Sequence, residues 1–178
     1  QSILVENDGE EEAIEGFGTD RDATKLSKEE IRKIVKDAGI VGLGGAGFPT
    51  HVKLTPKDEN AIDYVIVNGA ECEPYLTSDY RTMMEPRIEV CPLLTKYPQG
   101  GERTLIYAVT GREINSSMLP ADAGCIVDNI DTVASIYNAV CKTTPLIRKI
   151  ITVTGDAIAE PQNFEVRLGT NYQRLVEA

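Results

Sequence analysis

Hydrophobic positions alternate between helical and extended spacing along most of this chain. Residues 31–38 place Ile, Val and Ala on one helix face, after Ser27 and Glu30 in the arrangement of a capping box, and Gly39 follows them. Residues 62–67 form a β-branched run of strand length that ends at Asn68-Gly69. This part of the chain therefore predicts a helix followed by a strand.

The alternation continues toward the C-terminus. The further elements that we expect are a strand at 88–91, a helix at 102–109, a strand at 124–127 and a helix at 131–141. Strands that alternate with helices are typical of an α/β layered domain. From residue 146 the pattern changes to two strands at 149–154 and 164–168 and a short helix at 171–176, which indicates the start of a second module.

The most informative segment lies between the first helix and the first strand. Four of the six residues 42–47 are glycines, so main-chain N–H groups can approach an anion closely there, and Lys53 adds a mobile positive charge. We interpret the segment as a cradle for a nucleotide or flavin phosphate. It has no P-loop ending, and Phe48-Pro49 stands where a Rossmann turn would enter a helix. The alternative is a tight glycine turn packed beneath a sheet.

Two further regions, the carboxyl ends of the strands and the start of the helix at 102–109, have the character of ligand sites. Ligands of α/β sheets collect at the carboxyl ends of strands, where residues 68–73 and Asp128-Asn129 would emerge. Gly100-Gly101-Glu102 precedes the helix at 102–109, and a helix N-terminus with glycines before it favours anion binding through its dipole and free N–H groups. The alternative for this second segment is an ordinary helix start with an acidic first turn.

Composition narrows the classes of function. The formal charge of −10 disfavours nucleic acid as a partner, because duplex binding requires Lys and Arg to displace counterions. An apolar content of 42% without a long apolar run indicates a soluble globular protein, and no signal peptide is recognisable, so we expect the cytoplasm or a cytoplasmic membrane face. Acidic residues between 6 and 15 favour a solvated arm at 1–25.

The spacing of the cysteines and the presence of a single histidine argue against a metal site formed by this sequence alone. The cysteines lie far apart and never form Cys-x-x-Cys, and His51 alone cannot build a multi-histidine site. We therefore expect free thiols at all four cysteines, which are Cys72, Cys91, Cys125 and Cys141.

Several motifs in order resemble the C subunit of the Rnf electron-transport complex, a relative of the flavin-bearing NADH-dehydrogenase subunit of respiratory complex I. They are the glycine-rich segment 42–53, the turn at 68–75, the Lys-Tyr-Pro-Gln-Gly-Gly-Glu segment at 96–102, and Asp128-Asn129. The resemblance runs from about residue 26 to the C-terminus. It implies an FMN- and NADH-binding α/β domain like the complex I flavoprotein subunit at 26–145, followed by a truncated β-grasp (soluble-ligand-binding, SLBB-like) module at 146–178.

The resemblance also implies an activity and partners. FMN would exchange a hydride with NADH or NAD⁺ and pass single electrons through two 4Fe-4S clusters toward ferredoxin and the membrane subunits of an ion-translocating complex. The protein would be peripheral, on the cytoplasmic face of the cell membrane. The family carries further residues near Glu85-Pro86, so we expect an internal gap there, and its cluster-binding cysteines are absent here. We therefore expect a fragment, inactive alone, of a longer subunit.

The resemblance assigns cofactor contacts but no catalytic residue and no metal ligand. Lys53 would pair with the flavin phosphate or ring edge, and Asn68 with the flavin edge, while Glu71 and Glu73 would hold ribityl or ribose hydroxyls rather than act as an acid/base pair. Phe48 would pack against a nicotinamide ring, unless it is a buried core residue. The full expected set is Gly42, Gly44, Gly45, Phe48, Lys53, Asn68, Glu71, Glu73, Gly100, Gly101, Glu102, Asn129 and Thr132.

Two residues differ from those of the complex I relatives, and two other functions are compatible with the same motifs. Ala70 stands where those relatives carry Asp, and Asp128 where they often carry Asn, a carboxylate that would repel a phosphate. The same scaffold serves cobalamin reductases and amino-acid-reductase electron donors, which differ mainly in partner. A cofactor-free docking module is the third hypothesis. The polar residues around one loop, such as Lys53 and Asn129, argue against that third hypothesis.

Overall fold

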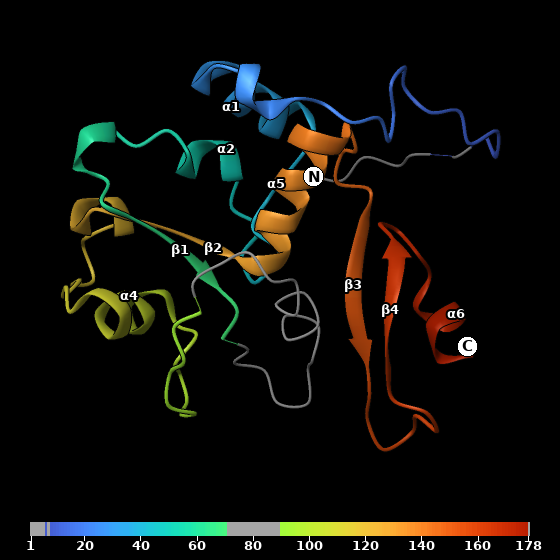
Figure 1. Ribbon diagram of the computed structural model, residues 1–178. Helices are drawn as coiled ribbons and strands as arrows, with labels where there is room; N and C mark the ends of the chain where they lie inside the picture. Colours follow the sequence, from blue (N-terminus) through green and yellow to red (C-terminus); the bar gives the residue numbers. More distant parts are fainter. Residues whose placement is uncertain (1–5, 7, 71–89, 178) are drawn as a thin grey trace.

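The structure is a computed structural model that describes residue 6, residues 8–70 and residues 90–177 (Figure 1). Its helical elements are η1 (Ala23–Lys25), α1 (Lys28–Asp37), α2 (Thr50–Lys53), η2 (Glu59–Ala61), α4 (Glu102–Thr110), η3 (Pro120–Ala123), α5 (Ile130–Lys142) and α6 (Tyr172–Val176). Its strands are β1 (Tyr64–Asn68), β2 (Cys125–Asn129), β3 (Arg148–Val153) and β4 (Gln162–Arg167). Within the described residues, no helix is both long enough and apolar enough to cross a bilayer.

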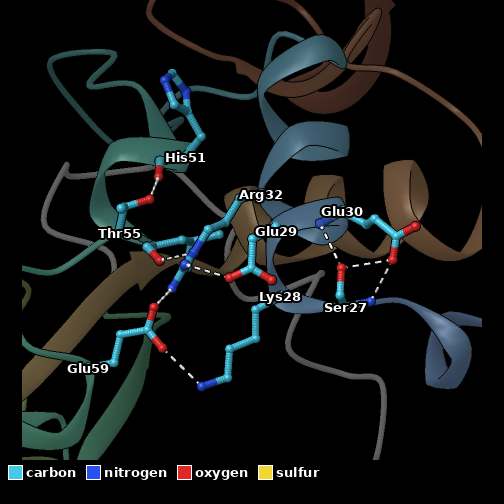
Figure 2. Close-up of polar contacts among 9 residues, drawn as sticks. Ser27, Lys28, Glu29, Glu30, Arg32, His51, Thr55 and Glu59 are labelled. Carbon is cyan, nitrogen blue, oxygen red and sulfur yellow. Dashed lines mark hydrogen bonds and ion pairs between the residues drawn. The ribbon is translucent and has the colours of Figure 1, made fainter.

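Helix α1 begins at the predicted capping box. The Glu30 main-chain N–H donates to Ser27 Oγ at 3.2 Å, and Glu30 Oε2 accepts from the Ser27 N–H at 2.8 Å, so two first-turn donors are satisfied (Figure 2). Arg32 on the same helix donates through Nε to the Leu54 carbonyl at 2.7 Å and pairs with Glu59, which Lys28 also reaches at 2.9 Å (Figure 2). These contacts hold the end of α2 and η2 against α1.

Strands β1 and β2 pair in parallel, as expected for an α/β layer. Tyr64 lies opposite Cys125 at one end, and Asn68 lies opposite Asn129 at the carboxyl end. Figure 1 shows α5 starting directly where β2 ends. The parallel register therefore brings the ends of both predicted strands to one edge of the layer.

Two hydrophobic clusters form the core. The first joins β1, β2 and α4, and its buried members are Ile66, Leu105, Ile106, Cys125 and Val127. The second joins α1 and α5, and its buried members are Val35, Ile40, Ala139 and Val140. Helices α1, α4 and α5 supply five of these nine buried side chains, and Val35 comes from the apolar helix face expected at residues 31–38.

Strands β3 and β4 form a separate antiparallel pair followed by α6, on one side of the β1–β2 layer in Figure 1. The predicted strands and helix of this region are confirmed to within two residues at each end. Two strands and one short helix do not define a β-grasp fold, so that assignment stays a prediction. The expected strand at 88–91 is wrong in its described half, because Val90 and Cys91 belong to no strand and are exposed.

The N-terminal segment is exposed over most of its described residues but is attached to β4 and to the C-terminal end of α5. Arg167 on β4 donates to both carboxylate oxygens of Glu11, at 2.7 and 3.1 Å, and this pairing lowers the pKa of Glu11. The Arg21 main-chain N–H donates to the Cys141 carbonyl at 2.7 Å, at the end of α5. The interpretation as a solvated arm therefore describes its exposure, while both contacts tie it to folded elements.

Candidate functional site

The segment 42–48, which we call the glycine loop, is closed at its base by main-chain hydrogen bonds. Val41 and Pro49 form an antiparallel bridge, the Gly42 N–H donates to the Phe48 carbonyl at 2.9 Å, and the Thr50 N–H donates to the Ile40 carbonyl at 3.1 Å. Gly47 adopts a φ of +67°, which an L side chain rarely takes. The loop is therefore a defined turn between α1 and α2.

The rim of the glycine loop carries main-chain donors that the protein leaves unused. Among the well-aligned hydrogen bonds within the described residues, none is donated by the N–H groups of Gly44, Gly45, Ala46 or Gly47, although residues 43–46 form a turn. These residues are exposed to solvent. Successive N–H groups without a protein partner, in a loop with little side-chain bulk, are typical of an anion-binding concavity.

Leu43 at the start of the loop is held through both of its main-chain polar groups. Its N–H donates to the Thr132 hydroxyl oxygen at 3.0 Å, and its carbonyl accepts from Lys149 Nζ at 3.2 Å. Thr132 is fully buried on α5, so here it supports the loop from within the protein. Lys149 comes from β3 and was not anticipated from the sequence.

The carboxyl ends of β1 and β2 carry the two predicted asparagines. Asn68 donates through Nδ2 to the Gly100 carbonyl at 2.9 Å, and its Oδ1 accepts from the Ala70 N–H at 3.1 Å. Asn129 caps α5 by accepting from the Asp131 N–H at 2.9 Å. Both side chains thus fix the segments that leave the strands.

Gly44 of the loop lies directly against Asn129. A Cβ atom placed on Gly44 would come within 2.9 Å of Asn129 Nδ2 and 3.0 Å of its Cβ and Cγ atoms. This separation is shorter than real Cβ contacts, so only glycine fits there without a shift of Asn129. The predicted need for glycine is explained at this position by close packing onto the end of β2.

Lys53 reaches the same strand end from α2. Its Nζ donates to the Val127 carbonyl at 2.9 Å and lies 3.5 Å from Asp128 Oδ1 and 3.8 Å from Glu102 Oε1. The side chain is 28% exposed. Lys53 therefore connects α2, β2 and the first turn of α4, and two carboxylates lie beside its charge.

Asp128 is the buried carboxylate of this cluster. It is 4% exposed, and its Oδ1 has no hydrogen-bond partner in the described part of the chain. Burial raises the pKa of Asp128, the nearby charge of Lys53 opposes that rise, and Glu102 adds to it. The carboxyl therefore holds a proton more readily than an exposed Asp.

Helix α4 begins beside this cluster. Gly101 is its N-cap residue, with no side chain to cap the first turn, and the Gly101 N–H donates to the Pro98 carbonyl at 2.9 Å. A Cβ on Gly101 would lie 3.1 Å from that carbonyl oxygen. Gly100, Gly101 and Glu102 are thus brought to the carboxyl edge of the strands.

Phe48 lies at the end of the glycine loop with 49% of its surface exposed. The alternative of a buried core phenylalanine is therefore wrong, and its proposed stacking on a ligand stays a prediction. Glu71 and Glu73 lie outside the described residues. The remaining expected residues lie on the glycine loop, the two strand ends, α2, α5 and the start of α4.

No group of three or more His, Cys, Asp or Glu side chains in the described ranges is arranged to hold a metal ion. Cys91, Cys125 and Cys141 are free thiols, and among these three only Cys91 is exposed. Burial raises the pKa of the Cys125 thiol. The expectation of iron–sulfur clusters concerns residues outside this chain.

The parallel strand ends, the glycine loop and the α4 N-terminus form one edge of an α/β domain, and a family model gives the class of this domain. The family model described as the Nuo51 FMN-binding domain matches residues 35–87 and 84–138. The two matched segments meet at residues 84–87. They are compatible with the predicted gap near Glu85-Pro86, which stays a prediction.

Curated relatives specify the family within that class. The chain is 40% identical over 219 residues to the C subunit of the proton-translocating ferredoxin:NAD⁺ oxidoreductase complex of Clostridium ljungdahlii, covering 99% of this chain and 48% of the relative. It is 38% identical over 222 residues to the C subunit of the Na⁺-translocating ferredoxin:NAD⁺ oxidoreductase complex of Acetobacterium woodii, covering 99% and 49%. The C subunit of the ion-translocating oxidoreductase complex of Pseudomonas aeruginosa is 36% identical over 184 residues, covering 80% and 24%.

This chain belongs to the family of C subunits of ion-translocating oxidoreductase complexes, the Rnf family. It spans about half the length of the Clostridium and Acetobacterium relatives. The resemblance inferred from the sequence motifs is thereby confirmed.

Proposed function

We propose that the carboxyl edge of β1 and β2 binds FMN, and that the domain is the electron-input site of an ion-translocating ferredoxin:NAD⁺ oxidoreductase. The unused N–H groups from Gly44 to Gly47 are the observation that carries this proposal. They form an anion cradle in a domain whose family model is named for FMN binding, and the end of β2 leaves no room for a side chain on Gly44.

The described residues are suited to the parts of FMN. The glycine loop offers donors for a phosphate, and the N-terminus of α4 offers a second set of donors beside a favourable dipole. Asn68 and Asn129 provide amide groups at the strand ends. Asp128 is the residue that fits least, since an ionised carboxylate repels a phosphate. Its burial and the Lys53 ammonium at 3.5 Å both reduce that repulsion.

FMN, when bound, supplies two-electron exchange with a nicotinamide and one-electron exchange with clusters. The tasks of this chain are binding and orientation. We propose that the loop N–H groups hold the phosphate, that Lys53 keeps the end of β2 and the start of α4 together, and that exposed Phe48 offers an aromatic face to the NADH ring.

The proposal extends to the whole protein. NADH is the substrate, and the partners are the other subunits of the membrane complex, with ferredoxin reached indirectly through 4Fe-4S clusters elsewhere in the full-length subunit. The names of the relatives support these partners for this chain, as does their coverage of almost the entire sequence. We place the subunit peripherally, on the cytoplasmic face of the membrane.

The test is a flavin titration of the full-length subunit after removal of any bound flavin. We expect saturable binding of one FMN per chain, seen as quenching of flavin fluorescence, and bleaching of the bound flavin by NADH under anaerobic conditions. Folded protein that binds no FMN would contradict the proposed site. Binding of FMN without reduction by NADH would contradict the proposed substrate only.

A further inference from the structure

Lys149 links the second module of the chain to the glycine loop. It lies on β3, where it pairs with Val166 of β4. Lys149 lines a groove of about 130 Å³ between β3, β4 and α6, with Ile151 and Leu175 among the other lining residues. Its Nζ then reaches the Leu43 carbonyl, 106 residues earlier in the chain, at 3.2 Å.

Leu43 is held through two successive peptide planes. The Leu43 N–H donates to Thr132 on α5, and the Leu43 carbonyl accepts from Lys149 on β3. The Leu43 carbonyl shares its peptide plane with the Gly44 N–H, which is the first of the unused donors. The direction of that donor therefore depends on how Lys149 holds this plane. An ammonium carries three donors, and Lys149 uses one of them on Leu43.

The charges of Lys53 and Lys149 differ in their surroundings. Lys53 lies within 4.0 Å of the carboxylates of Asp128 and Glu102, so its positive charge is largely balanced inside the protein. Across the described residues, no carboxylate forms an ion pair with Lys149. The unbalanced positive charge at the glycine loop therefore belongs to Lys149, although the sequence pointed to Lys53.

We propose that Lys149 is a positioning residue of the phosphate site: it holds the Leu43–Gly44 peptide from β3 and makes the affinity of the glycine loop for an organic phosphate depend on the β3–β4 pair. The inference rests on the proposed FMN site. A positive charge beside a loop of free N–H groups strengthens the binding of a phosphate far more than that of an uncharged group.

The test compares FMN with riboflavin, which lacks only the phosphate, on the full-length protein. Lys149→Met keeps an unbranched apolar stem in the groove and removes the ammonium. We expect it to weaken FMN binding about tenfold, because a charge-assisted interaction is lost, and to change riboflavin binding by less than about twofold. Lys149→Arg retains the charge and the donors, and we expect it to recover most of the FMN affinity.

Arg148→Met is the matched control. Arg148 is the preceding residue on β3 and pairs with Glu165 at 3.6 Å, so the substitution removes one positive charge from the same strand without touching the loop. We expect wild-type affinity for both flavins. In the wild-type protein, FMN binding should weaken with added salt, and in Lys149→Met this dependence should be shallower.

The outcomes separate this inference from the proposed function. A wild-type protein that binds no FMN contradicts the site itself. Suppose that the wild type binds FMN. If Lys149→Met then has the same FMN affinity as Arg148→Met, the proposed role of Lys149 in phosphate binding is wrong. The proposed role is also wrong if Lys149→Met loses FMN affinity and riboflavin affinity to the same degree. If Lys149→Met does not fold, Lys149→Gln, which keeps a donor without the charge, is held to the same criteria.

Discussion

The two ends of the parallel pair β1–β2 are built in opposite ways. At the amino end, Arg112 donates to the Ala123 carbonyl at 2.7 Å, pairs with Asp63 at 2.6 Å, and lies 5.0 Å from the centre of the Tyr64 ring. At the carboxyl end, the glycine loop keeps unused donors, and Asp128 Oδ1 has no hydrogen-bond partner among the described residues. The closed end stabilises the strands, whereas the open end is available to a ligand.

At each end of the β1–β2 pair, a glycine packs closely against a neighbouring side chain. A Cβ on Gly124 would meet Arg112, and a Cβ on Gly44 would meet Asn129. The same physical restriction should therefore have different consequences: a loss of stability at the closed end and a loss of ligand affinity at the open end. Substitutions at these two positions test the comparison most directly.

The largest effect is expected for Gly124→Ala. The new Cβ would lie 2.4 Å from Arg112 Nη1 and 2.8 Å from the Ala61 carbonyl oxygen, at a φ of +70°. Backbone strain and overpacking together should lower the free energy of unfolding by about 3 kcal/mol, measured by urea denaturation. Folded protein should keep its FMN affinity.

Gly111→Ala is the control for that substitution. Gly111 is the C-cap residue of α4, and its φ of +71° is nearly the same as that of Gly124. A Cβ on Gly111 would meet nothing within 4 Å. We expect a loss of about 1 kcal/mol, from backbone strain alone. Equal losses for both variants would show that the Arg112 cluster contributes nothing to the closed end.

At the open end we expect Gly44→Ala to weaken FMN binding about thirtyfold, roughly 2 kcal/mol, because the Cβ pushes the loop away from Asn129. The change in the free energy of unfolding should be smaller, about 1 kcal/mol, from disturbance of the Asn129 cap of α5. Calorimetric titration of the folded variant measures the first quantity, and denaturation the second.

Gly45→Ala is matched to Gly44→Ala. Gly45 is the next residue of the same loop, its φ is outside the strained range, and an added Cβ would meet nothing within 4 Å. FMN affinity should therefore stay within about threefold of the wild type. An equal loss at both glycines would mean that the loop excludes side chains for a reason other than its contact with Asn129.

The sequence predicted those parts of the site that depend on local pattern. Asn68 and Asn129 could be placed at one edge because parallel strands end together, and the start of α1 followed from a capping box. Lys149 could not be placed, because its contact with Leu43 joins residues 106 positions apart and depends on where β3 packs. The balance of charge at Lys53 was likewise set by tertiary packing.

At the open end, the buried carboxylate of Asp128 should lower the stability of the protein at neutral pH, and Asp128→Asn tests this expectation. Burial raises the folded-state pKa of Asp128 above its unfolded value, so the folded state binds this proton more tightly. The stabilisation that this proton gives the folded state is complete below the unfolded-state pKa and is lost as the pH rises through the folded-state pKa. Asparagine carries no charge, so the variant should be more stable than the wild type at neutral pH, by about 1 kcal/mol, and the gain should shrink toward about pH 4.

Urea denaturation of both proteins at several pH values measures this difference, and a double-mutant cycle with Lys53→Ala assigns its cause. Lys53 is the ammonium 3.5 Å from Asp128 Oδ1, so Lys53→Ala should cost more stability when Asp128 is present than in the Asp128→Asn background. If Asp128→Asn destabilises the protein at neutral pH, the ion pair outweighs the burial of the carboxylate, and the open end is stabilised by Asp128 rather than weakened by it.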